Sequence, residues 1–214
     1  YESDGSVPRK TIGAQELFLD ILKERAETGR LYIMNIDHCN SHSSFLDKVE
    51  MSNLCQEITL PTKPLEHIDD PNGEIALCIL SAVNVGKIRD LDDLKVLCDL
   101  AVRSLDELID FQNYPINAAE IATKARRSLG IGFIGLAHYL AKHGHDYNDP
   151  GAWQLVHNLT EAFQYYLISA TVDLAEEKGA CEYSSRTKYG NGILPIDTYK
   201  HDVDEIVPNE LHYD

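Results

Sequence analysis

Three polar side chains of different chemistry occupy alternate positions of one hexapeptide. The run Asn53-Leu54-Cys55-Gln56-Glu57-Ile58 spaces an amide, a thiol and a carboxylate two residues apart. In an extended segment, alternate side chains share a face at intervals of about 6.6 Å, so the spacing predicts one polar, reactive edge. A hydrogen-bonding amide, a nucleophilic or one-electron sulfur and a proton acceptor suit chemistry on a small polyol. A surface strand with an incidental cysteine has the same pattern, and the spacing alone leaves both interpretations open.

A polar segment upstream carries side chains of the kinds that bind metals. Asp37, His38, Cys39 and His42 fall within one span of six residues. A structural zinc site usually takes four ligands in two paired spacings, and no second pair follows. The sequence therefore predicts a polar loop over 37–44, held by its own side chains, and no metal site.

A glycine motif matches the dinucleotide-binding fingerprint by letter. Gly130, Gly132 and Gly135 stand in the order G-x-G-x-x-G. The fingerprint requires a strand before the glycines, a helix after them and an acidic residue about 20 positions on. The preceding residues 124–127 are mostly basic, and the nearest downstream acids lie in a polar stretch. The motif therefore favours a strand that packs closely against its neighbours over a nucleotide site.

Charge and cysteine usage exclude several classes of protein. The chain has 214 residues, with 19 basic and 35 acidic side chains and a net charge of −16, which argues against a broad surface for nucleic acid or anionic membrane. Five cysteines without framework spacing predict free thiols, and Cys98 is expected to be a small buried residue of a helix. A Cys-His hydrolase that uses Cys55 stays open, although no histidine stands out as its partner.

The hydropathy of the chain predicts its cellular compartment, and its first residues predict that it is part of a longer protein. No apolar run approaches the ~20 residues of a membrane span, and no signal pattern opens the chain, so a cytoplasmic protein is expected. The first residue is Tyr1 and the opening residues read as interior sequence, so we expect a piece of a longer chain.

Apolar periodicity predicts alternating helices and strands. Helices are expected where an apolar stripe repeats every three or four residues and a cap or a glycine marks the end. The expected helices are 14–28, 91–111, 118–127, 136–142 and 150–178. The expected strands are 31–36, 74–85 (which carries Cys78) and the glycine-spaced run 128–134. This alternation indicates an α/β fold.

Five runs of the chain together form a recognisable pattern. They are LYIMNIDHCN at 31–40, SNLCQEI at 52–58, EIALCILSAVNVG at 74–86, RRSLGIG at 126–132 and GILPIDTY at 192–199. The second cysteine, Cys78, follows Cys55 by 23 residues. These runs closely resemble one enzyme family, the class I ribonucleotide reductase large (α) subunit, and the resemblance covers essentially the whole chain.

The resemblance implies a fold and a set of site residues. Residues 1–214 would form a single helix-rich segment of a ten-stranded α/β barrel, with the N-terminal effector domain and the C-terminal part outside the chain. Cys55 would sit on a finger loop as a transient thiyl radical, Glu57 would take the 3′-OH proton, for which a desolvated carboxylate is suited, and Asn53 would orient the ribose. The implied substrate-binding residues are Asn53, Leu54, Cys55, Gln56 and Glu57.

The resemblance also implies what this chain works with. Cys78 matches one member of a redox-active dithiol whose partner lies outside the chain. The radical would come from a metal-containing small (β) subunit, so no metal or other cofactor is expected on this chain, and dNTP or ATP effectors would bind absent parts. The implied partners are a ribonucleoside diphosphate, thioredoxin or glutaredoxin as reductant, and a second large subunit, with no membrane and no nucleic-acid polymer. The isolated chain is expected to be inactive.

Two further hypotheses stay open at this point. The chain could be a non-catalytic barrel piece of a split large subunit that acts only in assembly. It could also be a two-electron thiol enzyme, in which case Cys55 has a depressed pKa and is alkylated rapidly at neutral pH.

Overall fold

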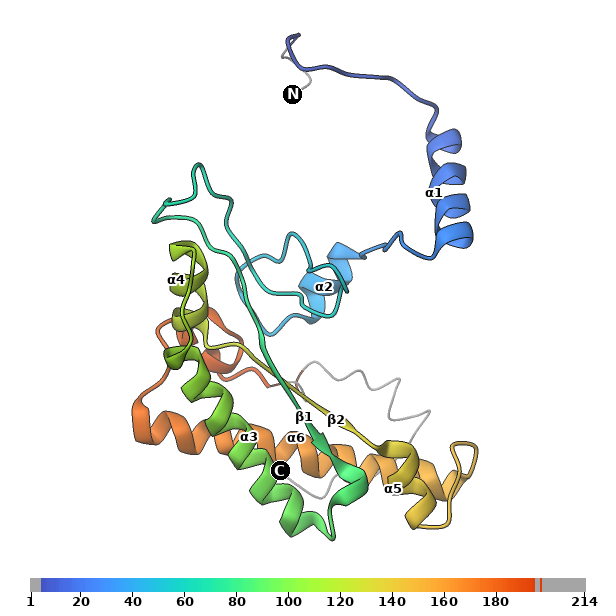
Figure 1. Ribbon diagram of the computed structural model, residues 1–214, viewed down its shortest axis with the longest axis vertical. Helices are drawn as coiled ribbons and strands as arrows, with labels where there is room; N and C mark the ends of the chain where they lie inside the picture. Colours follow the sequence, from blue (N-terminus) through green and yellow to red (C-terminus); the bar gives the residue numbers. More distant parts are fainter. Residues whose placement is uncertain (1–4, 195–196, 198–214) are drawn as a thin grey trace.

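Two parallel strands with helices on one side form the centre of the chain (Figure 1). The computed structural model describes residues 5–194 and 197. β1 (Ile79–Asn84) pairs with β2 (Leu129–Ile134), with Ile79 opposite Leu129 and Asn84 opposite Ile134. Parallel neighbours require a crossover, and α3 (Leu91–Phe111) and α4 (Asn117–Arg126) lie between the two strands in the sequence. This βαβ unit is the framework on which the thiol-bearing segments are placed.

The other helices surround this unit unevenly. α5 (Leu136–Lys142) follows β2 directly, and α6 (Pro150–Lys178) packs along α3. The remaining elements are α1 (Ala14–Thr28), α2 (Ile36–His42) and the 3-10 turns η1 (Val85–Lys87), η2 (Ser184–Arg186) and η3 (Tyr189–Asn191). None of the described helices is long and apolar enough to cross a membrane.

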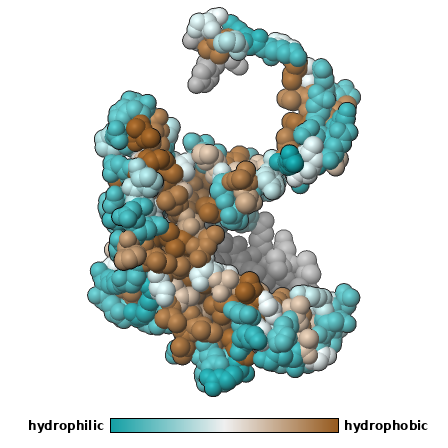
Figure 2. Space-filling view, in the orientation of Figure 1, coloured by the Kyte–Doolittle hydropathy of each residue, from teal (hydrophilic) through white to brown (hydrophobic). Residues whose placement is uncertain are grey.

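The two faces of the strand pair have different surroundings. Side chains alternate between faces, and Val83 packs with Leu94, Leu159 and Phe163 in the buried core between the sheet, α3 and α6. On the opposite face Leu80 remains 58% exposed. Figure 2 shows hydrophobic side chains at the surface across the middle of the molecule, where Figure 1 places the strands. Among the residues that the structure describes, the helices therefore cover one face of the pair and leave the other open.

Local signals determine where the long helices begin and end. The Asp90 side chain accepts a hydrogen bond from the Asp93 amide at 2.9 Å and caps α3. Asp149 caps α6 in the same way, with Pro150 in its first turn. Gly29 ends α1 in the left-handed conformation at φ 65°. The predicted helices at 14–28, 91–111, 136–142 and 150–178 are confirmed, and the one predicted at 118–127 occurs at Asn117–Arg126.

Two predictions upstream of the sheet are wrong. The strand predicted at 31–36 is irregular up to Asn35, and helix α2 begins at Ile36 and continues to His42, through most of the segment 37–44 predicted as a polar loop. A strand needs a partner for its backbone groups, and none of the described residues pairs with 31–35. The strand predicted at 74–85 is shorter, because Glu74 makes only an isolated bridge to Lys63 and regular pairing begins at Ile79.

Candidate functional site

The segment that carries Cys55 is a turn. The Gln56 amide donates to the Asn53 carbonyl at 3.1 Å, and the Ile58 amide donates to Asn53 Oδ1, also at 3.1 Å. Ser52 Oγ donates to the Ile58 carbonyl at 2.7 Å and closes the base of the turn. Gln56 has φ 63°, a left-handed conformation that few non-glycine residues adopt. The extended geometry predicted for 53–58 is therefore wrong, and Cys55 lies at the tip of a closed loop.

Solvent reaches this loop from several sides. Leu54 is 87% exposed, and Cys55 and Glu57 are exposed as well. The described residues therefore do not provide the shielding of the Glu57 carboxylate from water that was expected from the resemblance. A reactive sulfur in this position has access to a ligand, and also to water.

Cys78 lies where the chain enters β1, and it is half-buried. Burial raises the pKa of its thiol, and the negative charge of Glu57 raises it further. This effect requires Glu57 to lie within electrostatic range of Cys78. The structure thus brings the Cys55 turn and the second cysteine into one region, although 23 residues separate them in the sequence.

The coupling between Glu57 and Cys78 predicts a shift in thiol reactivity. Glu57→Gln removes a negative charge that disfavours the thiolate, so the pKa of Cys78 should fall and alkylation should reach its half-maximal rate at lower pH. The measurement is the rate of iodoacetamide labelling of Cys78 against pH, followed by mass spectrometry. Glu50→Gln is the control, because Glu50 is an exposed carboxylate upstream that pairs with Lys48. An unchanged profile for Glu57→Gln would contradict the coupling.

A partly buried ion cluster anchors the segments that carry both cysteines. We define it as Asp47, Glu74, Arg126 and Arg186, of which Glu74 and Arg126 are buried and the other two are half-buried. Arg126 Nη2 donates to Asp47 at 3.0 Å and to Glu74 at 2.9 Å, while Arg186 Nη2 lies 2.7 Å from Asp47. Asp47 precedes the Cys55 turn and Glu74 precedes Cys78 by four residues. One guanidinium therefore ties the approaches to both thiols to the end of α4.

The acids of this cluster remain charged despite their burial. The Glu74 side chain is only 2% exposed. Burial raises its pKa, but hydrogen bonds from Lys63 and Arg126 outweigh that effect and the pKa is lowered overall. For Asp47, hydrogen bonds from Arg186 and Arg126 likewise outweigh burial and lower the pKa. The cluster is thus a set of ionised groups held through Arg126 Nη2, while Arg126 Nε and Nη1 are buried without a hydrogen-bond partner among the described residues.

The sequence interpretation missed this cluster, although one signal for it was present. Arg126 follows Ala118 and Ala122 at helical spacing, on the buried stripe of α4. A charged residue at such a position needs a partner, because an unpaired buried charge is strongly unfavourable. The identity of the partners was not readable, because they lie 79 and 52 residues away along the chain.

The other motifs of the sequence carry no site among the described residues. His38, Cys39 and His42 lie on α2, and no group of three or more His, Cys, Asp or Glu side chains in the described part of the chain is placed to hold a metal. Gly130 and Gly132 lie inside β2, whereas a dinucleotide fingerprint needs its glycines in the turn after a strand. The predicted strand is confirmed here. Close packing is confirmed for Gly130 but not for Gly132.

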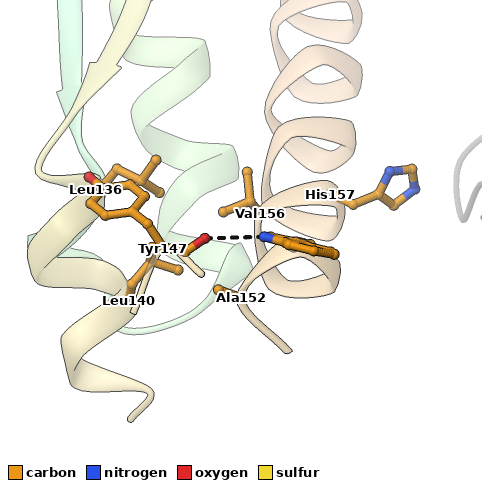
Figure 3. A pocket seen from close by; sticks show the side chains of 7 residues that line it. Leu136, Leu140, Tyr147, Ala152, Val156 and His157 are labelled. Carbon is orange, nitrogen blue, oxygen red and sulfur yellow. Dashed lines mark hydrogen bonds between the residues drawn. The ribbon is translucent and has the colours of Figure 1, made fainter. Parts of the chain in front are cut away.

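An apolar hollow of about 370 Å³ lies between α5 and α6, far along the chain from the thiols (Figure 3). Leu136, Leu140 and Val156 line it together with His157. The indole nitrogen of Trp153 donates to the Tyr147 carbonyl at 3.1 Å. No Asp, Glu, Lys or Arg side chain lines this hollow.

A helix-covered parallel strand pair, with one thiol at its start and another on an exposed turn, defines a βαβ unit of an α/β protein with a candidate cysteine site. The family model described as "Ribonucleotide reductase, barrel domain" matches residues 1–213, and the chain belongs to this family. It is 57% identical to the ribonucleoside-diphosphate reductase subunit alpha of Haemophilus influenzae, over 100% of this chain and 29% of that protein. The resemblance and the fold class predicted from the sequence are confirmed.

Other relatives carry related names. The chain is 55% identical to the ribonucleoside-diphosphate reductase 1 subunit alpha of Escherichia coli, over 100% of this chain and 28% of the relative. It is 41% identical to the subunit alpha of Enterobacteria phage T4, over 96% of this chain and 27% of the relative. The chain thus spans less than a third of the length of these relatives.

Proposed function

We propose that this chain is the segment of a ribonucleoside-diphosphate reductase large subunit that carries the radical cysteine and one cysteine of the redox pair. The observation that carries the proposal is the match of residues 1–213 to the ribonucleotide reductase barrel domain. The negative charge of Glu57, which adds to the effect of burial in raising the pKa of the Cys78 thiol, also supports it. A thiol that initiates and a thiol that reduces both have to reach one substrate, so they have to share one region.

Each residue of the turn has a role in this proposal. Cys55, as a thiyl radical, removes the hydrogen at C3′ of the ribose, reversibly because S–H and C3′–H bonds are close in strength. Glu57 accepts the proton of the 3′-OH. Asn53 Oδ1 already accepts from the Ile58 amide, so we assign the contact with the ribose hydroxyls to its Nδ2 group. Leu54 and Gln56 flank Cys55 at the substrate.

Reduction requires a dithiol. Loss of the 2′-OH as water consumes two electrons and two protons, so a ribonucleoside diphosphate and two thiols give a 2′-deoxyribonucleoside diphosphate, a disulfide and water. Cys78 supplies one thiol, and its partner belongs to a part of the protein outside this chain. The hydrogen held by Cys55 returns to C3′ at the end of the cycle, which restores the radical for return to its source.

The remaining components come from elsewhere. A metal-containing small (β) subunit supplies the radical, thioredoxin or glutaredoxin re-reduces the disulfide, and a second large subunit completes the enzyme in the cytoplasm. dNTP or ATP effectors bind parts beyond this segment, and the chain alone has no turnover. The exposure of Cys55 supports the last point, because a thiyl radical open to water is lost to side reactions.

The test separates the two thiols by the step that each performs. In the full-length large subunit with its small subunit, Cys78→Ser should lose multiple-turnover reduction but keep exchange of tritium from the 3′ position of the substrate, because hydrogen abstraction needs only Cys55. Cys98→Ser is the control, since Cys98 is fully buried in α3. Full reduction by Cys78→Ser would overturn the redox role, and reduction by the isolated chain would overturn the need for the other parts.

A further inference from the structure

The two glycines of β2 lie on the open face of the strand pair, but their neighbours differ. Gly130 is opposite Leu80 and Gly132 is opposite Ala82 in the parallel register. Cys78 precedes Leu80 by two residues, so Cys78, Leu80 and Ala82 share this face. Gly130 is therefore adjacent to the Cys78 sulfur, whereas Gly132 is not.

A side chain added at these positions would meet different surroundings. A Cβ at Gly130 would lie 2.4 Å from Leu80 Cδ2 and 2.9 Å from Cys78 Sγ. A Cβ at Gly132 would have nothing within 4 Å. The same substitution, glycine to alanine, can therefore be made at two positions of one strand. It would disturb Cys78 at Gly130 and would leave it undisturbed at Gly132.

The two side chains that a Cβ at Gly130 would contact differ in how easily they can move away. Leu80 is 58% exposed, so its terminal methyl can rotate away into solvent at little cost. Cys78 is half-buried, and its Sγ is 3.9 Å from the Ile79 carbonyl oxygen. The sulfur has one rotatable bond, and relief of a 2.9 Å contact has to turn that bond or shift the strand.

We propose that Gly130 is a positioning residue, which keeps open the space that the Cys78 sulfur occupies and thereby fixes where that sulfur meets its reaction partner. The inference rests on the redox role of Cys78 proposed above. A disulfide forms only within a narrow range of Cβ positions and torsions, so a small displacement of one sulfur prevents it. Glycine is thus required at position 130 by the position of the Cys78 sulfur. No described neighbour requires glycine at position 132.

The experiment compares alanine at the two positions in the full-length large subunit with its small subunit. A displacement of about 1 Å from the reactive geometry costs roughly 10²-fold in rate, so Gly130→Ala should lower kcat by about 10- to 100-fold with little change in KM. Gly132→Ala should leave kcat near the parent value. The labelling rate of Cys78 by iodoacetamide should change in Gly130→Ala and stay unchanged in Gly132→Ala, and this readout needs no turnover.

A second pair of variants separates the sulfur from the leucine and guards against misfolding. Leu80→Ala removes the 2.4 Å contact, so the double variant Leu80→Ala/Gly130→Ala keeps only the contact with the sulfur. It should fold with the melting temperature of Leu80→Ala and stay slow. Recovery of the double variant, or equal behaviour of the two glycine variants, would overturn the inference. If Cys78→Ser reduces substrate normally, the proposed function fails instead, and the labelling comparison still tests the geometry at Gly130.

Discussion

Cys55→Ser should abolish ribonucleotide reduction by the full-length large subunit, if the turn has the chemistry proposed for it. An oxygen–hydrogen bond is much stronger than the C3′–H bond, so a serine can neither hold the radical nor return the hydrogen. We expect a loss of more than about 10³-fold, equivalent to a barrier higher by at least ~4 kcal/mol. The fold should survive, because Cys55 is exposed at the tip of the turn and makes no part of the core. The measurement is deoxynucleotide formation with the small subunit and reductant supplied.

A matched substitution tests whether the effect belongs to position 55. Cys39→Ser makes the same exchange of sulfur for oxygen at a half-buried thiol of α2 and should leave activity near the parent value. Tritium exchange at C3′ should be absent in Cys55→Ser as well, which distinguishes it from the expected behaviour of Cys78→Ser. Retained reduction in Cys55→Ser would exclude radical initiation at this residue, and equal losses in both serine variants would point to a structural cause.

The long helices could be predicted because their determinants are local. α3 combines the cap at Asp90 with an apolar stripe that contains Leu94 and Cys98, and both lie within one stretch of sequence. α6 combines Asp149 and Pro150 at its start with Gly179 at its end. Cys98 is fully buried as predicted, and burial raises the pKa of its thiol to about 11. Signals of this kind need no knowledge of the partner segments.

The upstream half could not be predicted in the same way. A strand exists only if another segment pairs with it, and the apolar run at 31–36 contains no information on whether one does. The turn at 53–58 depends on bonds between the Asn53 side chain and nearby backbone, which compete with extended structure. The period of two therefore gave the wrong geometry for the residues of the proposed site.

The sequence proposes the residues of the candidate site but not their arrangement. The types and spacing of Asn53, Cys55 and Glu57 suggested a reactive edge, and the family resemblance supplied the role proposed for each. The influence of Glu57 on Cys78 arises from contacts between distant segments, and so does the partly buried ion cluster. Their partners are 21, 52 or 79 residues apart, and one sequence without relatives contains no signal that pairs them.

Arg126→Met should loosen the segments that lead to both thiols. Methionine keeps much of the side-chain volume but removes the guanidinium that donates to both Asp47 and Glu74. Loss of one partner of a buried pair costs about 3–5 kcal/mol, and the low end applies here because Lys63 remains 2.6 Å from Glu74 and Arg186 remains 2.7 Å from Asp47. At about 3 kcal/mol, local opening becomes roughly 10²-fold more frequent. The measurement is hydrogen–deuterium exchange of peptides spanning 44–50 and 72–80 in the full-length protein.

Arg103→Met is the matched control, since Arg103 also contacts two acids through its guanidinium. Its Nη atoms lie 2.7 Å from Glu177 and its Nε lies 2.8 Å from Asp99, but the side chains of these acids are 54% and 45% exposed. Water can solvate exposed carboxylates after their partner is removed, so exchange near Arg103 should change little. Faster exchange confined to Arg126→Met would support burial as the cause, because the two variants lose the same charge and the same number of acidic partners. Similar exchange in both variants would mean that the cluster at Arg126 does not hold the Cys55 and Cys78 segments in place.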